Sequence, residues 1–155
     1  MAAGGQIHPR AVGPEALHLR FCAGGNGLPY LRGKWHTPEA RHIWCQQDKA
    51  IIELPATHLP ATDYWLEIRG FSVSYQDYMP ARQLGVRLNG AELVQTWATG
   101  NARVIMHLPA SLLAGRDSVT IEIDYPVIGP ARLLGAVGDS RKLGFGLTDI
   151  VVYEI

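Results

Sequence analysis

"LGVRLNGAELV", residues 84–94, carries the strongest indication of fold in this sequence. Asn89-Gly90 lies between two runs in which apolar residues alternate with others. Both residues tolerate the positive φ angles of a type I′ turn, whose twist matches that of two antiparallel strands. The segment therefore predicts a β-hairpin.

Similar alternating runs, separated by 10 prolines and 17 glycines, occupy much of the remaining chain. Alternation places one row of side chains on each face of a strand. Gly70 lies within one such run and indicates a β-bulge, and residues 109–115 indicate a single helical turn. We predict an all-β domain, a two-sheet antiparallel β-sandwich of the jelly-roll type. The other predicted strands are residues 15–22, 42–45, 49–54, 64–74, 102–108, 118–124 and 145–153.

Length and composition suit one compact domain. The chain has 155 residues, of which 47% are hydrophobic, and its 14 basic residues balance 14 acidic ones. Zero net charge argues against a broad nucleic-acid or anionic-membrane surface. The sequence has neither a signal-peptide pattern nor an apolar run of about 18 residues, so we expect a soluble, cytoplasmic protein without a membrane span. We expect a flexible segment over residues 1–14, which could be the edge of a longer protein, and one domain over 15–155.

Residues 84–125 resemble the second half of a galactose-binding-like jelly roll, in which such a hairpin leads to a strand, a Leu-Pro…Leu-Leu…Gly run and a closing strand. A narrower resemblance runs from Gly33 to the end of the chain. This part is similar to the accessory β-sandwich of bacterial glycan- and polysaccharide-assembly proteins, which is often found with glycosyltransferases. The matching motifs are Gly33-Lys-Trp35, Glu39, Trp44, Pro130, Leu134-Gly135 and Asp139-Ser-Arg141-Lys-Leu143-Gly144.

Two departures from that pattern occur at Lys34, which separates Gly33 from Trp35, and at Cys45-Gln46, which follows Trp44. No nucleotide-binding βαβ pattern, as a transferase domain would need, is present. The resemblance implies a noncatalytic carbohydrate-associated module that binds a glycan or supports a glycan-synthesis enzyme.

Candidate ligand contacts gather in residues 34–44, "KWHTPEARHIW". Aromatic faces pack against sugar C–H surfaces, while planar polar groups meet hydroxyls. The alternative is that the tryptophans fill the end of the sandwich while Glu39 and Arg41 pair at the surface. The candidate glycan-binding residues are Trp35, Glu39, Arg41, His42, Trp44 and Arg141. Of the other tryptophans, Trp65 is expected in the core and Trp97 at a rim.

Asp139 and Arg141 are interpreted as a structural clasp that fixes the approach to the last strand. In a turn, the Asp139 carboxylate can accept backbone N–H groups, and the Arg141 guanidinium can bind a carboxylate or carbonyl groups. The alternative is a polar grip on a glycan. If the pair is buried, loss of one partner would cost about 3–5 kcal/mol.

Metal binding and catalysis have weaker support. Zinc normally needs four closely paired ligands, which His36, His42 and Cys45 do not complete. No loop concentrates the oxygen ligands that calcium requires. We therefore expect no cofactor, and calcium is the alternative that stays open.

Nucleophile and phosphate-loop motifs are absent, so we expect no enzyme. Cys22 and Cys45 are expected as thiols rather than a disulfide. The dispersed acids are Glu53, Glu67, Glu122, Asp117, Asp124, Asp139 and Asp149.

A second class of function stays open at the level of sequence. Exposed edge strands and loop aromatics also suit a protein–protein interaction or assembly module. Its partner would be a glycan-synthesis enzyme or a second copy of the chain.

Overall fold

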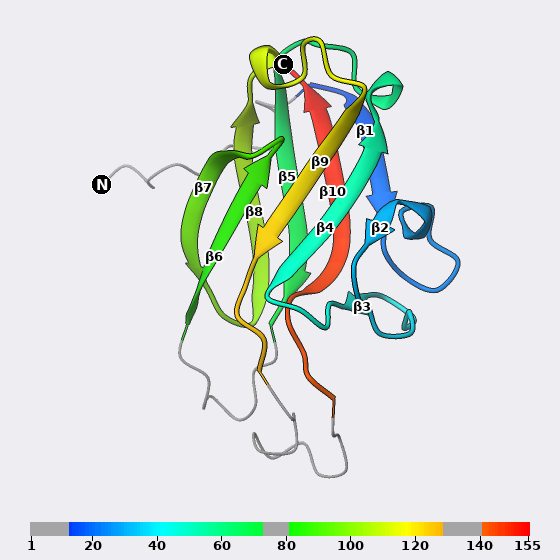
Figure 1. Cartoon of the computed structure of the whole chain (residues 1–155), viewed down its shortest axis with the longest axis vertical. Helices are drawn as coiled ribbons and strands as arrows, with labels where there is room; N and C mark the ends of the chain where they lie inside the picture. The colour runs from blue at the N-terminus through cyan, green and yellow to red at the C-terminus, as the bar shows by residue number, and fades with distance from the viewer. Residues whose placement is uncertain (1–12, 73–80, 129–140) are drawn as a thin grey trace.

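The computed structural model describes residues 13–72, 81–128 and 141–155, and these form two antiparallel sheets packed face to face (Figure 1). Sheet A has the strand order β1-β10-β5-β8, with β3 also paired to β10, and sheet B has the order β2-β4-β9-β6-β7. The predicted all-β, two-sheet antiparallel sandwich of the jelly-roll type is therefore confirmed.

Sheet A lies behind sheet B in the view of Figure 1. Its strands are β1 (Glu15–Arg20), β3 (Ile43–Trp44), β5 (Tyr64–Phe71), β8 (Asn101–Leu108) and β10 (Gly146–Glu154). Sheet B comprises β2 (Leu31–Arg32), β4 (Lys49–Pro55), β6 (Arg82–Leu88), β7 (Ala91–Ala98) and β9 (Ser118–Asp124). Three short 3-10 turns connect them: η2 (Leu28–Tyr30), η3 (Ala56–His58) and η4 (Ala110–Leu112).

The core follows the alternation of the sequence. In β9 every second side chain, Val119, Ile121 and Ile123, is fully buried between the sheets. In β5 the inward residues are Leu66 and Ile68. Because side chains of a strand point alternately to opposite faces, the residues between them lie on the outer surfaces of the sandwich.

The hairpin of residues 84–94 forms as predicted. Asn89 has φ 51° and Gly90 has φ 85°, which are the left-handed conformations that the turn requires. The Asn89 side chain also holds the turn against neighbouring elements: its amide donates to Leu112 O at 2.8 Å and its oxygen accepts from Thr120 N at 2.9 Å. Asn89 thus has a second structural role besides its backbone conformation.

The predicted bulge lies on a different strand from Gly70. The register between β5 and β10 shifts between Leu147 and Asp149, so the extra residue belongs to β10. Gly70 instead allows a close approach of chains, because a Cβ there would lie 2.3 Å from Gly146 O and 2.4 Å from the Phe145 ring. The prediction located the irregularity correctly but assigned it to the wrong strand.

Trp65 also differs from expectation. Its neighbour Leu66 fills the core, so Trp65 points to the outer face of sheet A, where it is half-buried. There its ring meets the His107 ring edge-on, with centroids 5.8 Å apart. The expected core position of Trp65 was therefore wrong.

Candidate functional site

The two tryptophans of the predicted contact loop do not share a surface. Trp44 is only 6% exposed and packs with Phe71, Leu143 and the edge of His42. Trp35 is half-buried against the main core, and its indole N–H donates to Arg32 O at 2.8 Å. The two rings therefore fill separate clusters, as in the alternative reading of this loop, in which the tryptophans serve packing.

The polar residues of the loop form a small cluster around Glu39. Glu39 Oε2 lies 3.3 Å from Arg141 Nη1 and 3.2 Å from His42 Nε2, which is not aligned for a hydrogen bond. Arg41 is exposed and is not the partner of Glu39; among the described residues it has no ion pair. Asp139, the other half of the predicted clasp, lies outside the described residues. Arg141 therefore joins the loop of Glu39 to the segment that precedes β10.

The remaining candidates are dispersed over the sandwich. Cys22 and Cys45 are free thiols, and burial raises the pKa of the Cys45 thiol, which keeps it protonated. Asp117, Asp124 and Asp149 lie in a loop, in sheet B and in sheet A respectively. In the described ranges, no group of three or more His, Cys, Asp or Glu residues is placed to hold a metal ion.

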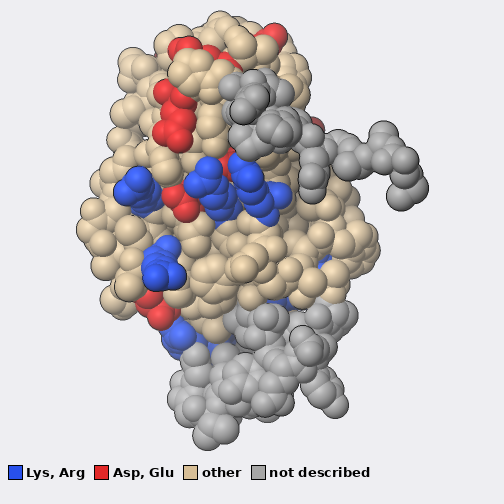
Figure 2. Space-filling model, turned by 180° about the vertical axis from the view of Figure 1, so that it is seen from behind, with Lys and Arg blue, Asp and Glu red and all other residues tan. Residues whose placement is uncertain are grey.

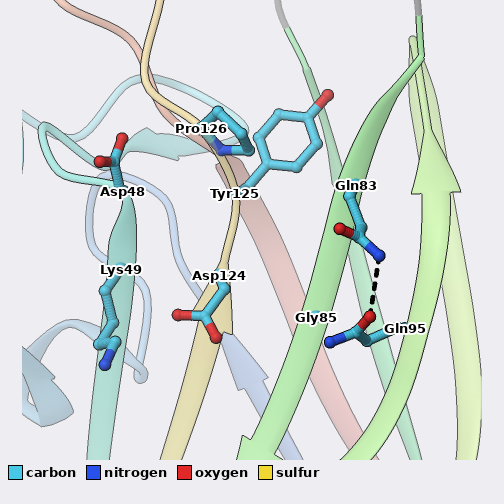
Figure 3. Close-up of a pocket in the computed structure, with 8 residues that line it drawn as sticks. All are labelled: Asp48, Lys49, Gln83, Gly85, Gln95, Asp124, Tyr125 and Pro126. Carbon is cyan, nitrogen blue, oxygen red and sulfur yellow. Dashed lines mark hydrogen bonds between the residues drawn. The ribbon is translucent and has the colours of Figure 1, made fainter.

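A groove of about 340 Å³ lies on the outer face of sheet B (Figure 3). Four of its residues form one transverse row across four adjacent strands: Lys49 in β4, Asp124 in β9, Gly85 in β6 and Gln95 in β7. Gly85 has no side chain and so forms the floor between Asp124 and Gln95. The groove thus results from a glycine in the middle of a sheet whose neighbours carry long polar side chains.

Paired amides line the groove on the β6–β7 side, and an exposed aromatic ring lies next to them on the same sheet face. Gln83 Nε2 donates to Gln95 Oε1 at 2.8 Å, which orients both planar groups (Figure 3). Trp97 pairs with Gln83 across the strands and lies two residues from Gln95, so all three share one face. Its side chain is 68% exposed, and Trp97 and Ile155 are the large exposed hydrophobic residues of the described structure.

Charges of both signs line the opposite side. Lys49 Nζ lies 3.4 Å from Glu122, and Arg87 Nε lies 3.6 Å from Asp124. All four side chains are partly exposed, so their remaining donors and acceptors face solvent. The groove therefore offers hydrogen-bond donors and acceptors with no large excess of either charge, and the exposed ring of Trp97 lies next to it, in a separate pocket at the β7–β8 edge.

The Tyr125–Pro126 end of the groove is fixed by Arg82. Its guanidinium lies over the Tyr125 ring at 4.3 Å, and Nη1 donates to Pro126 O at 2.5 Å. Tyr125 in turn donates its hydroxyl to Ala98 O at 3.0 Å. Burial lowers the pKa of the Arg82 guanidinium below its ordinary value. These contacts connect the end of β9 to β6 and β7, while Arg82 Nε and Nη2 are buried without a hydrogen-bond partner among the described residues.

Sequence reasoning missed this groove although it predicted the hairpin that supplies half of it. Gln83, Gly85, Gln95 and Trp97 are outward positions at the ends of the two hairpin strands that lie away from the turn, and Arg87 and Glu92 are outward positions nearer the turn. Planar amides, a glycine and a tryptophan together on one solvent face were a usable signal. Trp97 was expected at a rim, and it stands beside the groove.

Comparison with known proteins identifies the fold. No protein-family model matches the chain, and no curated protein matches its sequence. Among solved structures, a family GH115 4-O-methyl-α-glucuronidase, BtGH115A, with specificity for decorated arabinogalactans, aligns with 96% of this chain at 13% identity and a TM-score of 0.55. The chain spans 19% of the length of that enzyme.

Within the described residues, no helix is long and apolar enough to cross a membrane.

Two smaller proteins align at lower TM-scores. The CBM36-1 domain of a multidomain xylanase, from the hindgut metagenome of Trinervitermes trinervoides, covers 92% of this chain and 98% of its own length at 10% identity and a TM-score of 0.49. A family 35 carbohydrate binding module from Clostridium thermocellum covers 79% of this chain and 88% of its own at 11% identity and 0.44. At such identities the BtGH115A alignment shows the fold, a two-sheet β-sandwich, and the site must be argued from its own residues.

Proposed function

We propose that this chain is a noncatalytic carbohydrate-binding module and that the groove on the outer face of sheet B receives the glycan. The observation that carries the proposal is the exposed ring of Trp97 beside the hydrogen-bonded Gln83–Gln95 pair. A sugar ring presents an apolar C–H face and a rim of hydroxyls. Trp97 matches the first and the amide pair matches the second.

The rest of the groove extends this complementarity. Hydroxyl groups both donate and accept, and the groove supplies Lys49 as a donor and Asp124 as an acceptor in one row. The mixture of charges does not favour an ionic ligand, so we infer that the preferred glycan is neutral. A groove open along the sheet face suits an internal part of an oligosaccharide chain.

Catalysis is not part of the proposal. Glu53 and Glu122 lie in sheet B, within 3.9 Å of Arg32 and 3.4 Å of Lys49 respectively. Glu67 lies on the other sheet, where hydrogen bonds lower its pKa, whereas a general acid needs a raised one. These three glutamates therefore give no support to the acid–base pair of a glycoside hydrolase.

Titration with a panel of neutral oligosaccharides, followed by tryptophan fluorescence and calorimetry, tests the proposal. We expect saturable binding that Trp97→Ala weakens by at least about fivefold, since buried aromatic anchors dominate such contacts. Gly85→Ala should also weaken binding, because its methyl group occupies the groove floor. That methyl fits without strain, with its nearest atoms at 3.8 Å, so the melting temperature should not fall.

Trp65→Phe is the matched control, since it alters a tryptophan on the opposite face. It should leave both the affinity and the fluorescence response to a glycan in place. Absence of binding across the panel by the folded wild-type protein would contradict the proposal, as would equal affinities of the wild type and Trp97→Ala.

An interaction module is the second candidate, and the same tryptophan favours it. Trp97 lies on β7, the edge strand of sheet B, and exposed aromatic residues on edge strands suit protein partners. The partner would be a glycan-synthesis enzyme or a second copy. Sedimentation at high protein concentration tests whether the partner is a second copy of the chain. Self-association that Trp97→Ala abolishes would support this candidate, and a monomer at all concentrations would contradict it.

A further inference from the structure

A row of charged residues crosses the outer face of sheet A, on the side opposite the groove. Arg20 of β1, Asp149 of β10, Arg69 of β5 and Arg103 of β8 are successive partners in the strand register. Figure 2 shows blue side chains in a band across this face, with red between them. We refer to these four residues as the arginine row. Neighbouring strands lie about 4.8 Å apart, so Arg20 and Arg69 are about 10 Å apart and Arg69 and Arg103 about 5 Å.

A buried carboxylate holds two of these arginines. Glu67 is fully buried, two residues from Arg69 along β5. Its Oε1 accepts from Arg69 Nε at 2.6 Å and from the Tyr153 hydroxyl at 3.0 Å, and its Oε2 accepts from Arg103 Nε. A carboxylate with both oxygens occupied fixes the planes of both guanidinium groups side by side.

The guanidinium groups keep donors for another molecule. Arg103 is 56% exposed and uses Nε on Glu67, so its two terminal nitrogens have no partner among the described residues. Arg69 uses Nε and Nη2, and its Nη1 likewise has none in that set. The exposed Arg20 side chain makes no ion pair within the described part of the chain. The row thus presents three cations with unused N–H groups along one line.

We propose that the arginine row binds an acidic polysaccharide, a linear glycan that carries carboxylate or sulfate groups. Arg69 and Arg103 together would take one anionic group, and Arg20 would take a second one further along the same chain. Planar guanidinium groups bind both oxyanions through paired hydrogen bonds. Because Arg20 lies about 10 Å from Arg69, a linear polyanion can contact both ends of the row, whereas a single small anion contacts only one.

The position of Asp149 within the row favours a sugar polymer as the ligand over other polyanions. It stands between Arg20 and Arg69 and accepts from His18 Nε2 at 2.7 Å. A carboxylate in the middle of the row repels a continuous phosphate backbone but can accept hydrogen bonds from hydroxyl groups. The zero net charge of the protein also provides no long-range attraction for nucleic acid. This proposal shares only the ligand class with the proposed function, and its site is on the other face.

The test is calorimetric titration of the full chain at low ionic strength with two acidic probes, an oligogalacturonate and a sulfated oligosaccharide. The matched neutral probe is the methyl-esterified oligogalacturonate, which keeps the shape and loses the charge. We expect at least one acidic probe to bind, the methyl ester to bind far more weakly, and added salt to weaken binding. The two acidic probes distinguish carboxylate from sulfate recognition.

Arg20→Gln is the decisive variant, because its exposed side chain has no described ion pair whose loss would affect folding. It should weaken binding of the acidic probe by about tenfold, as expected for one charge-assisted contact. Arg116→Gln removes the same charge from an exposed loop position away from the row and should leave affinity unchanged. Gly85→Ala, which places a methyl group on the groove floor, should also leave it unchanged, which separates this site from the groove.

Three results would overturn the proposal. The first is no binding of either acidic probe by the folded protein. The second is equal loss of affinity in Arg20→Gln and Arg116→Gln. The third is binding of polyglutamate or single-stranded DNA as tight as that of the acidic glycans, since the site would then recognise charge alone.

Discussion

Glu67 gives the clearest prediction at the scale of single residues. Burial alone would raise the pKa of its carboxyl group, but hydrogen bonds from Arg103, Arg69 and Tyr153 outweigh burial and hold this pKa below its ordinary value. Glu67→Gln keeps the volume and removes the charge. We expect it to lower the free energy of unfolding by about 1–3 kcal/mol at neutral pH, because charged donors lose their acceptor. Urea denaturation measures this loss.

The pH dependence of that loss has a definite sign. A glutamate in the unfolded chain titrates at about pH 4.3. Because the native pKa is lower, the stabilisation by Glu67 is fully present above about pH 4.3 and disappears as pH falls through the native pKa. The difference in stability between the wild type and Glu67→Gln should therefore narrow in acid. A difference that widens below pH 4.3 would mean that Glu67 is protonated in the native protein.

At the scale of elements, the hairpin shows what the sequence could predict. Asn89-Gly90 determined the turn, and alternation gave the outward residues on each side of a register shift between Val86 and Arg87, which alternation did not predict. Local rules were sufficient for the turn, since it depends on neighbouring residues only. The hydrogen bonds from the Asn89 side chain to Leu112 and Thr120 were not predictable, because the partners are 23 and 31 residues away in the chain.

Asn89→Gly separates the two roles of that residue. Glycine adopts positive φ readily, so the turn should persist, while the side-chain hydrogen bonds to Leu112 O and Thr120 N are lost. We expect the free energy of unfolding to fall by about 1–3 kcal/mol, because half-buried backbone groups lose their partners. Gly90→Ala in the same turn is the comparison: its Cβ meets no atom within 4 Å, so any loss reports backbone strain alone.

The loop of residues 34–44 shows what the sequence left open, which was a glycan contact loop or tryptophans that fill the end of the sandwich. Outside a regular strand nothing local indicates which way a side chain points. Trp44 forms a short β3 pairing with β10 and is covered by Phe71 and Leu143, which come from distant parts of the chain. Long-range packing therefore decided the burial of this ring, whereas the exposure of Trp97 followed from its place in an edge strand.

Arg141 connects two elements of the structure, because it links that loop to the segment before β10. Its side chain is 38% exposed and that of its partner Glu39 is 41% exposed. A pair so accessible to solvent contributes about 1 kcal/mol or less. We therefore expect Glu39→Gln, which removes this ion pair and leaves Arg141 in place, to lower the melting temperature only slightly, and thermal unfolding at two salt concentrations checks this. A large loss would mean that the Glu39–Arg141 pair acts as a structural clasp.

At the scale of the whole molecule, the sandwich carries a polar transverse row on each outer face. Sheet B has Lys49, Asp124, Gly85 and Gln95, and sheet A has Arg20, Asp149, Arg69 and Arg103. The glycine makes the first row a groove, and the three arginines of the second outnumber the carboxylates of Asp149 and Glu67 that contact them or lie between them. The core separates the two rows, although at the β7–β8 edge Trp97, beside the groove, and Arg103 of the arginine row line one pocket.

That separation predicts independent binding of two ligands. Contacts without shared partners contribute additively, so saturation with a neutral glycan should leave the affinity for an acidic one unchanged, and the reverse should hold. Titration of the acidic probe into protein that is already saturated with the neutral one measures this directly. Arg20→Gln should affect only the acidic titration and Gly85→Ala only the neutral one. Competition between the ligands would place both on a single face and would contradict the assignment of separate sites.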